Sequence, residues 1–380
     1  MSPLFEIIGR EIVRHGALPF ARFMELALYC PKHGYYETNK DNPGRHGDFY
    51  TSVGTGEIFG RLLAFQFAGW LEELRIVECE LRIVEAGAHD ARLAADILGW
   101  LRLKRPELFG QIEYWILEPS VQRQEWQRET LKDFIPHVRW FDDFRSLSFS
   151  NPQSAIRNPQ LNGVIFSNEL LDAMPIHRFG WDAATRTWFE WGVTVEAKKF
   201  IWTKIRGSQL PSSIRRLPSS LLEVLPDGYV LETGPTAENW WREAAGILER
   251  GKLMTIDYGL TADEWISPDR LGGTLRGYFR HHVSADVLAN VGEQDLTAHV
   301  NFSCLQTAGE SAGLKTESFQ TQSQFLTQVL EKALKTDSFG ELVASKHSED
   351  GWTAALARQF QSLTHPEHLG RAFRVLTQSR

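Results

Sequence analysis

The stretch that decides the fold is IVEAGAHDARLAADIL, residues 83–98. Residues 83–86 are almost continuously apolar, as in a strand that is covered on both faces. The apolar residues after Arg92 recur at helical spacing, so a helix follows. Between them stands Gly87, which lets the backbone turn sharply and approach a ligand. The helix N-terminus behind this turn suits a carboxylate or a phosphate, although a plain strand–helix turn explains the pattern equally well.

The alternation of strand and helix continues along the chain. We expect buried strands at 81–86, 112–118, 138–141, 163–167 and 251–257, and further strands at 314–319 and 373–377. Such alternation predicts an α/β fold with a parallel sheet and helices on both faces. Two stretches break the rhythm: residues 188–205 alternate at period two and predict an antiparallel hairpin, and residues 265–300 have little periodicity.

Bulk composition excludes several classes of protein. The 380 residues are 42% hydrophobic and 23% charged, which is ordinary for a globular protein. The net charge of −7 gives no nucleic-acid footprint, and no apolar run approaches the roughly 18 residues that span a bilayer. The charged N-terminal stretch does not resemble a secretory signal. The three cysteines are far apart in the sequence, so we expect no disulfides and a cytoplasmic location.

Ligands of open parallel sheets bind outside the carboxyl ends of the strands. Glu118 ends the second strand, where an acidic residue can accept hydrogen bonds from both hydroxyls of a ribose. The alternative is a solvated turn residue. The other polar residues that follow strand ends are Glu85, His89 and Asp90, then Asn168, Glu169 and Asp172, and finally Asp257 and Tyr258.

SNELLDAMP, residues 167–175, contains two carboxylates three positions apart. On a helical turn Glu169 and Asp172 share a face, and paired carboxylates can hold a guanidinium through two parallel hydrogen bonds. The alternative is a helix N-cap followed by acidic residues that the helix dipole favours.

Two further sets of residues could form binding sites. GDFYTS, residues 47–52, offers backbone donors, hydroxyls and aromatic rings, and an aromatic face can hold a cation such as a sulfonium. A loop packed by its own side chains is the alternative. His281, His282 and His299 lack the spacing of metal ligands, and we expect no metal.

Motifs along nearly the whole chain resemble those of the MidA-like methyltransferases. This family of class I S-adenosylmethionine (SAM)-dependent enzymes includes a mitochondrial complex I assembly factor that is a protein-arginine methyltransferase. The matching stretches are LALYCPKHGYY (26–36), GDFYTSVGTGEIFG (47–60), IVEAGAHDARLAADIL (83–98), YWILEPS (114–120), SNELLDAMPIHRF (167–179), LMTIDYG (253–259), TLRGYFRHHV (274–283), GEQDLTAHVNFS (292–303) and HLGRAFRVLTQS (368–379).

The resemblance implies a Rossmann-like seven-stranded methyltransferase sheet, with the last strand antiparallel and helices on both faces. It implies an N-terminal helical cap with a cofactor-covering loop over residues 1–60. The methyltransferase core then covers residues 61–380, with insertions at about 177–225, which holds the hairpin, and about 262–295. The implied cofactor is SAM and the implied partner is a protein substrate; we expect no nucleic acid and no membrane insertion.

The resemblance also implies roles for individual residues. The implied cofactor-binding residues are Gly47, Asp48, Phe49, Thr51, Ser52, Glu85, Gly87, His89, Glu118 and Asn168. It also implies that Asn168, Glu169 and Asp172 face the methyl acceptor as catalytic residues.

The sequence departs from the family pattern at three positions. His89 and Ala91 replace two glycines of the usual E-L-G-x-G-x-G, and Asn301 stands where an aspartate is usual. We expect positive φ at His89, a conformation that histidine tolerates better than most residues. The implied activity is arginine methylation. A small-molecule methyltransferase and a non-catalytic SAM-binding scaffold are the alternatives, whereas a dehydrogenase is disfavoured because GxGxxG is absent.

Overall fold

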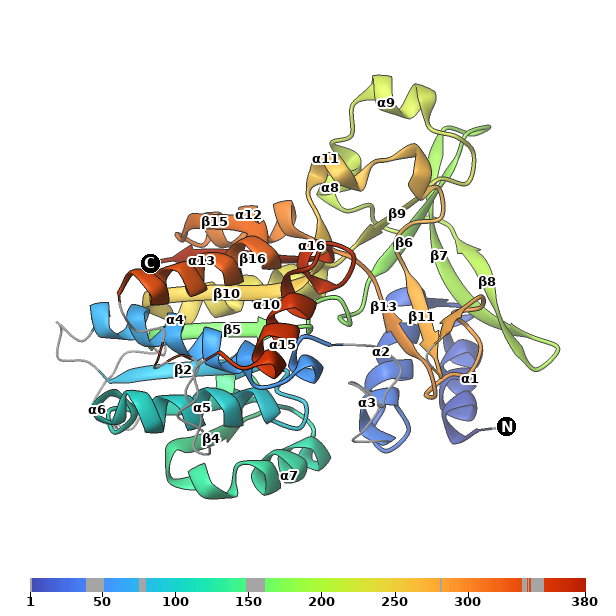
Figure 1. Cartoon of the computed structure of the whole chain (residues 1–380). Coiled ribbons are helices and arrows are strands. Elements are labelled where there is room, and N and C mark those ends of the chain that lie inside the picture. Colours follow the sequence, from blue (N-terminus) through green and yellow to red (C-terminus); the bar gives the residue numbers. More distant parts are fainter. Residues whose placement is uncertain are drawn as a thin grey trace, which may run out of the picture. The chain divides into compact units, whose positions relative to one another are not determined.

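The computed structural model describes residues 2–38, 51–74, 80–147, 161–280, 282–336, 340, 342 and 352–380. The chain forms two compact units (Figure 1). Unit 1 consists of Met1–Asn42, Asp172–Asn239 and Leu260–Cys304, and unit 2 consists of Pro43–Leu171, Trp240–Gly259 and Leu305–Arg380. Each compact unit gathers three separate segments. The expected division into residues 1–60 and 61–380 stays a prediction.

A twisted sheet forms the centre of unit 2. Seven of its strands lie in the order β15-β16-β10-β5-β2-β3-β4. Neighbours from β10 to β4 are parallel, whereas β16 is antiparallel to both β10 and β15. The strands are β2 (Leu81–Ala86), β3 (Ile112–Leu117), β4 (Val138–Phe141), β5 (Leu161–Asn168), β10 (Leu248–Leu260), β15 (Lys315–Thr321) and β16 (Phe373–Ser379). This order confirms the predicted seven-stranded sheet with an antiparallel last strand.

Helices cover both faces of this sheet (Figure 1). Apolar side chains of α4, α5, α13 and α15 form one core cluster with Ile83, Ile116 and Phe166 of the sheet. On another part of the sheet, the Trp241 indole of α10 donates a hydrogen bond to Gln378 of β16 (2.8 Å). All six residues of β2 are buried, as its apolar sequence predicts for a strand between two layers.

The helices that accompany the sheet are listed here with their bounds: α4 (Ile58–Leu74), α5 (Arg92–Lys104), α6 (Pro106–Phe109), α7 (Val121–Thr130), α10 (Pro235–Ile247), α12 (Phe302–Ser311), α13 (Gln322–Lys335), α15 (Ala354–Thr364) and α16 (Leu369–Ala372). Short 3-10 helices are η1 (Val53–Thr55), η2 (Lys132–His137) and η3 (Phe144–Ser146).

A five-stranded antiparallel sheet organises unit 1. Strands β1 (Leu18–Pro19), β7 (Thr187–Glu196), β6 (His177–Asp182) and β9 (Val230–Thr233) lie side by side, and β8 (Lys199–Ile205) pairs with β7. The β7–β8 pair confirms the predicted hairpin. Its turn residues Ala197 and Lys198 both have positive φ (46° and 62°), as the twist of a two-residue hairpin turn requires. The hairpin therefore belongs to a larger sheet, which the sequence did not predict.

The predicted N-terminal helices pack on this sheet. The elements are α1 (Pro3–His15), α2 (Phe20–Tyr29), α3 (Tyr35–Thr38), α8 (Ser212–Arg215), α9 (Ser219–Val224), α11 (Ala262–Trp265) and η4 (Pro268–Arg270). Ile8 of α1 and Phe23 of α2 share an apolar cluster with Val193 and Phe200 of the hairpin. The stretch with little periodicity forms a small sheet, β12 (His282–Ser284), β11 (Arg276–Phe279) and β13 (Asp295–Thr297), followed by β14 (Val300–Asn301).

Within the described part of the chain, no helix has both the length and the apolar content that a bilayer crossing requires. The same residues hold no group of three or more side chains that could bind a metal ion.

Candidate active site

The carboxyl ends of three neighbouring strands in unit 2 lie at one level. Ala86, the last residue of β2, pairs with Leu117 of β3 on one side and with Ser167 of β5 on the other. The residues that follow these three positions therefore emerge at the same edge of the sheet. They include Gly87 and His89, Glu118, and Asn168 and Glu169, so the structure brings these predicted site residues together.

The turn after β2 is held in a conformation that few residues adopt. Gly87, His89 and Ala91 all have positive φ (73°, 47° and 63°), which confirms the expectation for His89. A Cβ atom at position 87 would lie 2.8 Å from Cδ1 of Leu170, so glycine is needed there for space as well as for its backbone angle. This close approach joins the turn after β2 to the turn after β5.

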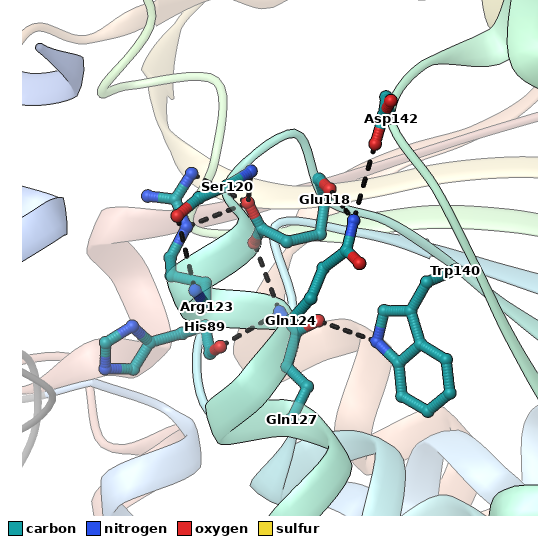
Figure 2. A network of polar contacts seen from close by, with 8 residues as sticks. All are labelled: His89, Glu118, Ser120, Arg123, Gln124, Gln127, Trp140 and Asp142. Carbon is teal, nitrogen blue, oxygen red and sulfur yellow. Dashed lines mark hydrogen bonds and ion pairs between the residues drawn. The ribbon is translucent and has the colours of Figure 1, made fainter. Parts of the chain in front are cut away.

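Glu118 is only 2% exposed, and several hydrogen-bond donors orient its carboxylate. Its Oε1 accepts hydrogen bonds from the backbone N–H of Ser120 (2.9 Å) and from Nε of Arg123 (2.9 Å), and Nη2 of Arg123 lies 2.8 Å away. Its Oε2 accepts from Gln127 (3.1 Å; Figure 2). A carboxylate has about four lone-pair positions, two on each oxygen. The remaining capacity for a ligand hydroxyl therefore lies on Oε2.

Gln127, on α7, connects Glu118 with the turn after β2. Its Nε2 donates both to Glu118 and to the backbone carbonyl of His89 (3.0 Å). Its Oε1 accepts from the indole N–H of Trp140 (2.9 Å; Figure 2). Sequence reasoning missed Gln127, although it stands four residues after Arg123 and so shares a face of the helix with it.

Glu85 lies inside the sheet rather than at its open edge. Its carboxyl accepts a hydrogen bond from the Tyr114 hydroxyl (2.6 Å). Burial raises the pKa of Glu85 to about 7, and the Tyr114 hydrogen bond offsets part of this effect. The predicted role of Glu85 in cofactor binding stays a prediction.

The turn after β5 carries two buried acceptor atoms that have no hydrogen-bond partner among the described residues. Oε1 of Glu169 accepts from the backbone N–H of Ser52 (2.9 Å) and from Nδ2 of Asn168 (3.1 Å). Oε2 of Glu169 and Oδ1 of Asn168 are buried without a hydrogen-bond partner among the described residues. Burial raises the pKa of Glu169 to about 8, opposed by its hydrogen bonds to Ser52 and Asn168. Buried acceptors without donors suit a ligand that brings its own N–H or O–H groups.

The expected helical turn after this strand is wrong. Residues 169–174 form bends and turns, and Glu169 itself has positive φ (50°). The fully buried carboxylate of Asp257 accepts the N–H groups of Leu170 (3.2 Å) and Leu171 (2.8 Å). The backbone is therefore held by a carboxylate from the neighbouring strand β10, and Glu169 and Asp172 do not share a helical face.

The N-terminal loop reaches this turn through Ser52. Besides its N–H contact to Glu169, Ser52 donates its hydroxyl to Oε1 of Gln322 (3.1 Å), and Thr51 caps Gly54 (3.0 Å). Of the predicted loop residues, Gly47, Asp48 and Phe49 lie outside the described residues, so their role stays a prediction.

Asp172 belongs to unit 1 and lies in a buried group of aromatic and acidic residues there. The Tyr36 hydroxyl donates to Oδ1 of Asp295 (2.9 Å). Burial and the charges of Asp295 and Asp172 raise the pKa of Tyr36 well above its usual value, and burial also raises that of Tyr278. Sequence reasoning did not single out Tyr36, Tyr278 or Asp295, although each lies in a stretch that resembles the MidA-like family.

Comparison with known proteins agrees with this arrangement. Residues 62–320 match a family described as "S-adenosyl-L-methionine-dependent methyltransferase". The crystal structure of a COG1565 superfamily member from Burkholderia thailandensis bound to S-adenosyl-homocysteine is similar, with a TM-score of 0.79 and 30% identity. The match covers 99% of this chain and 92% of that chain.

Curated relatives are similar over almost the full chain. The mouse protein named "Protein arginine methyltransferase NDUFAF7, mitochondrial" is 26% identical over 98% of this chain and 83% of its own length. The human protein of the same name is 25% identical over 98% and 82%.

These relatives are named as mitochondrial, which contradicts the cytoplasmic location expected from the cysteines. Unpaired cysteines argue only against oxidising compartments and do not distinguish among the reducing ones. Because the matched family covers more than half of the chain, the protein belongs to the S-adenosyl-L-methionine-dependent methyltransferases.

Proposed function

We propose that this methyltransferase transfers a methyl group from SAM to the guanidinium of an arginine in a protein. The observation that carries the proposal is the buried carboxyl of Glu169, whose Oε2 has no partner among the described residues. The names of the curated relatives support arginine as the acceptor.

Glu118 binds the ribose of SAM in this proposal. The backbone N–H of Ser120 and the guanidinium of Arg123 hold its Oε1, and Oε2 retains capacity for a hydroxyl. The turn at Gly87 brings the backbone close to the nucleoside. Oδ1 of Asn168, which has no partner among the described residues, is available to an N–H or O–H donor of the cofactor. The donor and acceptor pattern at this edge therefore fits SAM.

SAM supplies, when bound, a methyl group on a sulfonium, a good leaving group. The chain must hold the attacking nitrogen roughly 3–3.5 Å from that methyl and in line with the bond that breaks. A nitrogen–carbon bond forms, the sulfur keeps the electron pair, and the guanidinium must lose one proton. Glu169 accepts this proton, since a base with a pKa near the working pH is the most effective. Asn168 orients Glu169 through its Nδ2.

The approaching guanidinium also explains how Glu169 becomes ionised. An opposite charge nearby favours the carboxylate over the carboxylic acid, so acceptor binding lowers a pKa that burial has raised. Asp172 lies in unit 1, and its role toward the acceptor remains part of the proposal. It is tested by Asp172→Asn in the assay below.

The test measures methyl transfer from isotopically labelled SAM to candidate proteins, with mass spectrometry of the modified residue. Glu169→Gln keeps the shape of the side chain but cannot take a proton, so we expect kcat to fall by roughly 100-fold or more. The SAM affinity should change little. Glu129→Gln, an exposed residue that pairs with Lys132, is the matched control.

Two results contradict the proposal. Methylation by Glu169→Gln at nearly the wild-type rate, with unchanged SAM affinity, removes Glu169 from the reaction. Modification of a small molecule, but of no arginine in any protein tested, replaces the proposed acceptor.

A further inference from the structure

We infer that Gln127 is a positioning residue of the cofactor site, whose side-chain amide fixes the turn after β2 and the carboxylate of Glu118 relative to each other. This inference rests on the proposed role of Glu118 as the ribose ligand. The side chain of Gln127 is fully buried, so it acts through His89 and Glu118 rather than by contact with the cofactor.

The contacts of Gln127 leave its amide one orientation. The indole N–H of Trp140 needs an acceptor, so Oε1 must face Trp140 (2.9 Å) and Nε2 must face the opposite way. There, the two amide hydrogens meet the carbonyl of His89 (3.0 Å) and Oε2 of Glu118 (3.1 Å). The three contacts are drawn in Figure 2. Rotation of the amide would break all three hydrogen bonds in a buried place, which is unfavourable.

The turn after β2 needs such a restraint because two of its residues with positive φ, His89 and Ala91, are not glycine. His89 has a φ of 47°, which a residue with a Cβ tolerates poorly. The hydrogen bond from Gln127 to the His89 carbonyl stabilises this peptide plane in the observed orientation. The His89 ring meets the Trp126 ring edge-on, with 6.2 Å between the ring centres, so α7 holds both the backbone and the side chain of His89.

The same amide restrains Glu118. Arg123 and Ser120 hold Oε1, and Gln127 donates to Oε2, the oxygen with capacity for a ribose hydroxyl. Without Gln127 the carboxylate can rotate about its hydrogen bonds to Arg123. The affinity for SAM then falls, while the proton transfer assigned to Glu169 is unaffected.

The main test replaces the amide by an apolar group of similar shape. For Gln127→Met we expect the SAM dissociation constant, measured by calorimetry, and KM for SAM to rise about tenfold, as for the loss of a hydrogen bond to a charged group. At saturating SAM, kcat and KM for the acceptor should stay within about twofold of the wild type. Gln122→Met is the matched control, since Gln122 is exposed on the same helix and its side chain donates to Glu125.

A second variant distinguishes positioning from a general loss of packing. Gln127→Glu keeps size and shape but places a second carboxyl beside Glu118, with Arg123 as the nearby cation. Two close carboxylates resist joint ionisation. The SAM affinity of Gln127→Glu, relative to the wild type at each pH, should therefore fall as the pH rises. A role in packing alone gives a ratio that does not depend on pH.

Glu118→Gln separates this inference from the proposed function. If Glu118→Gln weakens SAM binding and both Gln127 variants bind SAM within about twofold of the wild type at every pH, Gln127 has no positioning role and Glu118 keeps its own. If Glu118→Gln binds SAM as tightly as the wild type, the proposed ribose site is wrong and the inference fails with it. A fall in kcat for Gln127→Met without any rise in KM for SAM also overturns the inference.

Discussion

At the scale of single residues, the site depends on backbone angles that the sequence predicts only in part. Gly87 was predicted to form a tight turn, and its positive φ and its close approach to Leu170 explain why glycine is favoured there. His89 and Ala91 adopt positive φ without being glycine. Such angles are held by surrounding contacts, as Gln127 contacts the carbonyl of His89, and those contacts cannot be deduced from local sequence.

Gly87→Ala should destabilise the protein and weaken SAM binding. The added Cβ would meet Leu170 at 2.8 Å, and positive φ is unfavourable for alanine. We expect the free energy of unfolding in urea to fall by about 1–3 kcal/mol. Leu170→Ala in the same chain should recover the part that comes from the clash.

The control for this prediction is Gly99→Ala in the interior of α5, where an added Cβ meets nothing within 4 Å. It should stabilise the protein by up to about 1 kcal/mol. A Gly87→Ala variant as stable as the wild type, with unchanged SAM affinity, would show that this turn tolerates an ordinary residue.

Glu169 gives the reaction a defined pH dependence. Burial raises its pKa to about 8, so the carboxyl is mostly protonated below that pH and cannot accept a proton. We expect kcat/KM for the acceptor to rise almost tenfold per pH unit below about 8 and to level off above it. A profile that is flat from about pH 6 to 8 excludes Glu169 as the base in the free enzyme, and Glu169→Gln should abolish the rise.

At the scale of elements, regular periodicity predicted the strands and the hairpin correctly, whereas the helical turn inferred for Glu169 and Asp172 was wrong. The parallel strands and the hairpin were predicted because apolar runs and period-two alternation reflect burial directly. The helical turn at 169–172 was wrong because Asp257, 86 positions from Leu171, takes the backbone N–H groups that a helix N-terminus presents. A contact so distant in the sequence leaves no local pattern.

Asp257→Asn tests this account of the turn after β5. Oδ1 and Oδ2 of Asp257 accept N–H groups from Tyr258 (2.8 Å), Leu170 and Leu171. Asparagine turns an NH₂ donor toward one of these N–H groups, which leaves buried donors unsatisfied. We expect a loss of about 1–3 kcal/mol in the free energy of unfolding.

The SAM affinity of Asp257→Asn should also fall, because Asn168 and Glu169 are displaced with the turn. Asp133→Asn, at an exposed position of unit 2, is the control. Equal stability and equal SAM affinity of Asp257→Asn and the wild type would mean that the turn is held by other contacts.

At the scale of the whole molecule, the sequence predicted the methyltransferase sheet but not the sheet of unit 1. Each unit gathers three segments that are far apart in sequence, and the five-stranded sheet of unit 1 combines β1 with strands from residues 177–233. Pairing of such distant strands depends on tertiary packing, which periodicity does not encode. The predicted cytoplasmic location was wrong because cysteine content indicates redox conditions and not a specific compartment.

The most direct test of the central claim is a crystal structure of this protein with S-adenosyl-homocysteine bound. We expect Oε2 of Glu118 within hydrogen-bond distance, roughly 2.6–3.2 Å, of a ribose hydroxyl, with Gly87 beside the nucleoside. A structure in which the ribose lies away from Glu118, and Glu118 contacts only Ser120, Arg123 and Gln127, would contradict the account.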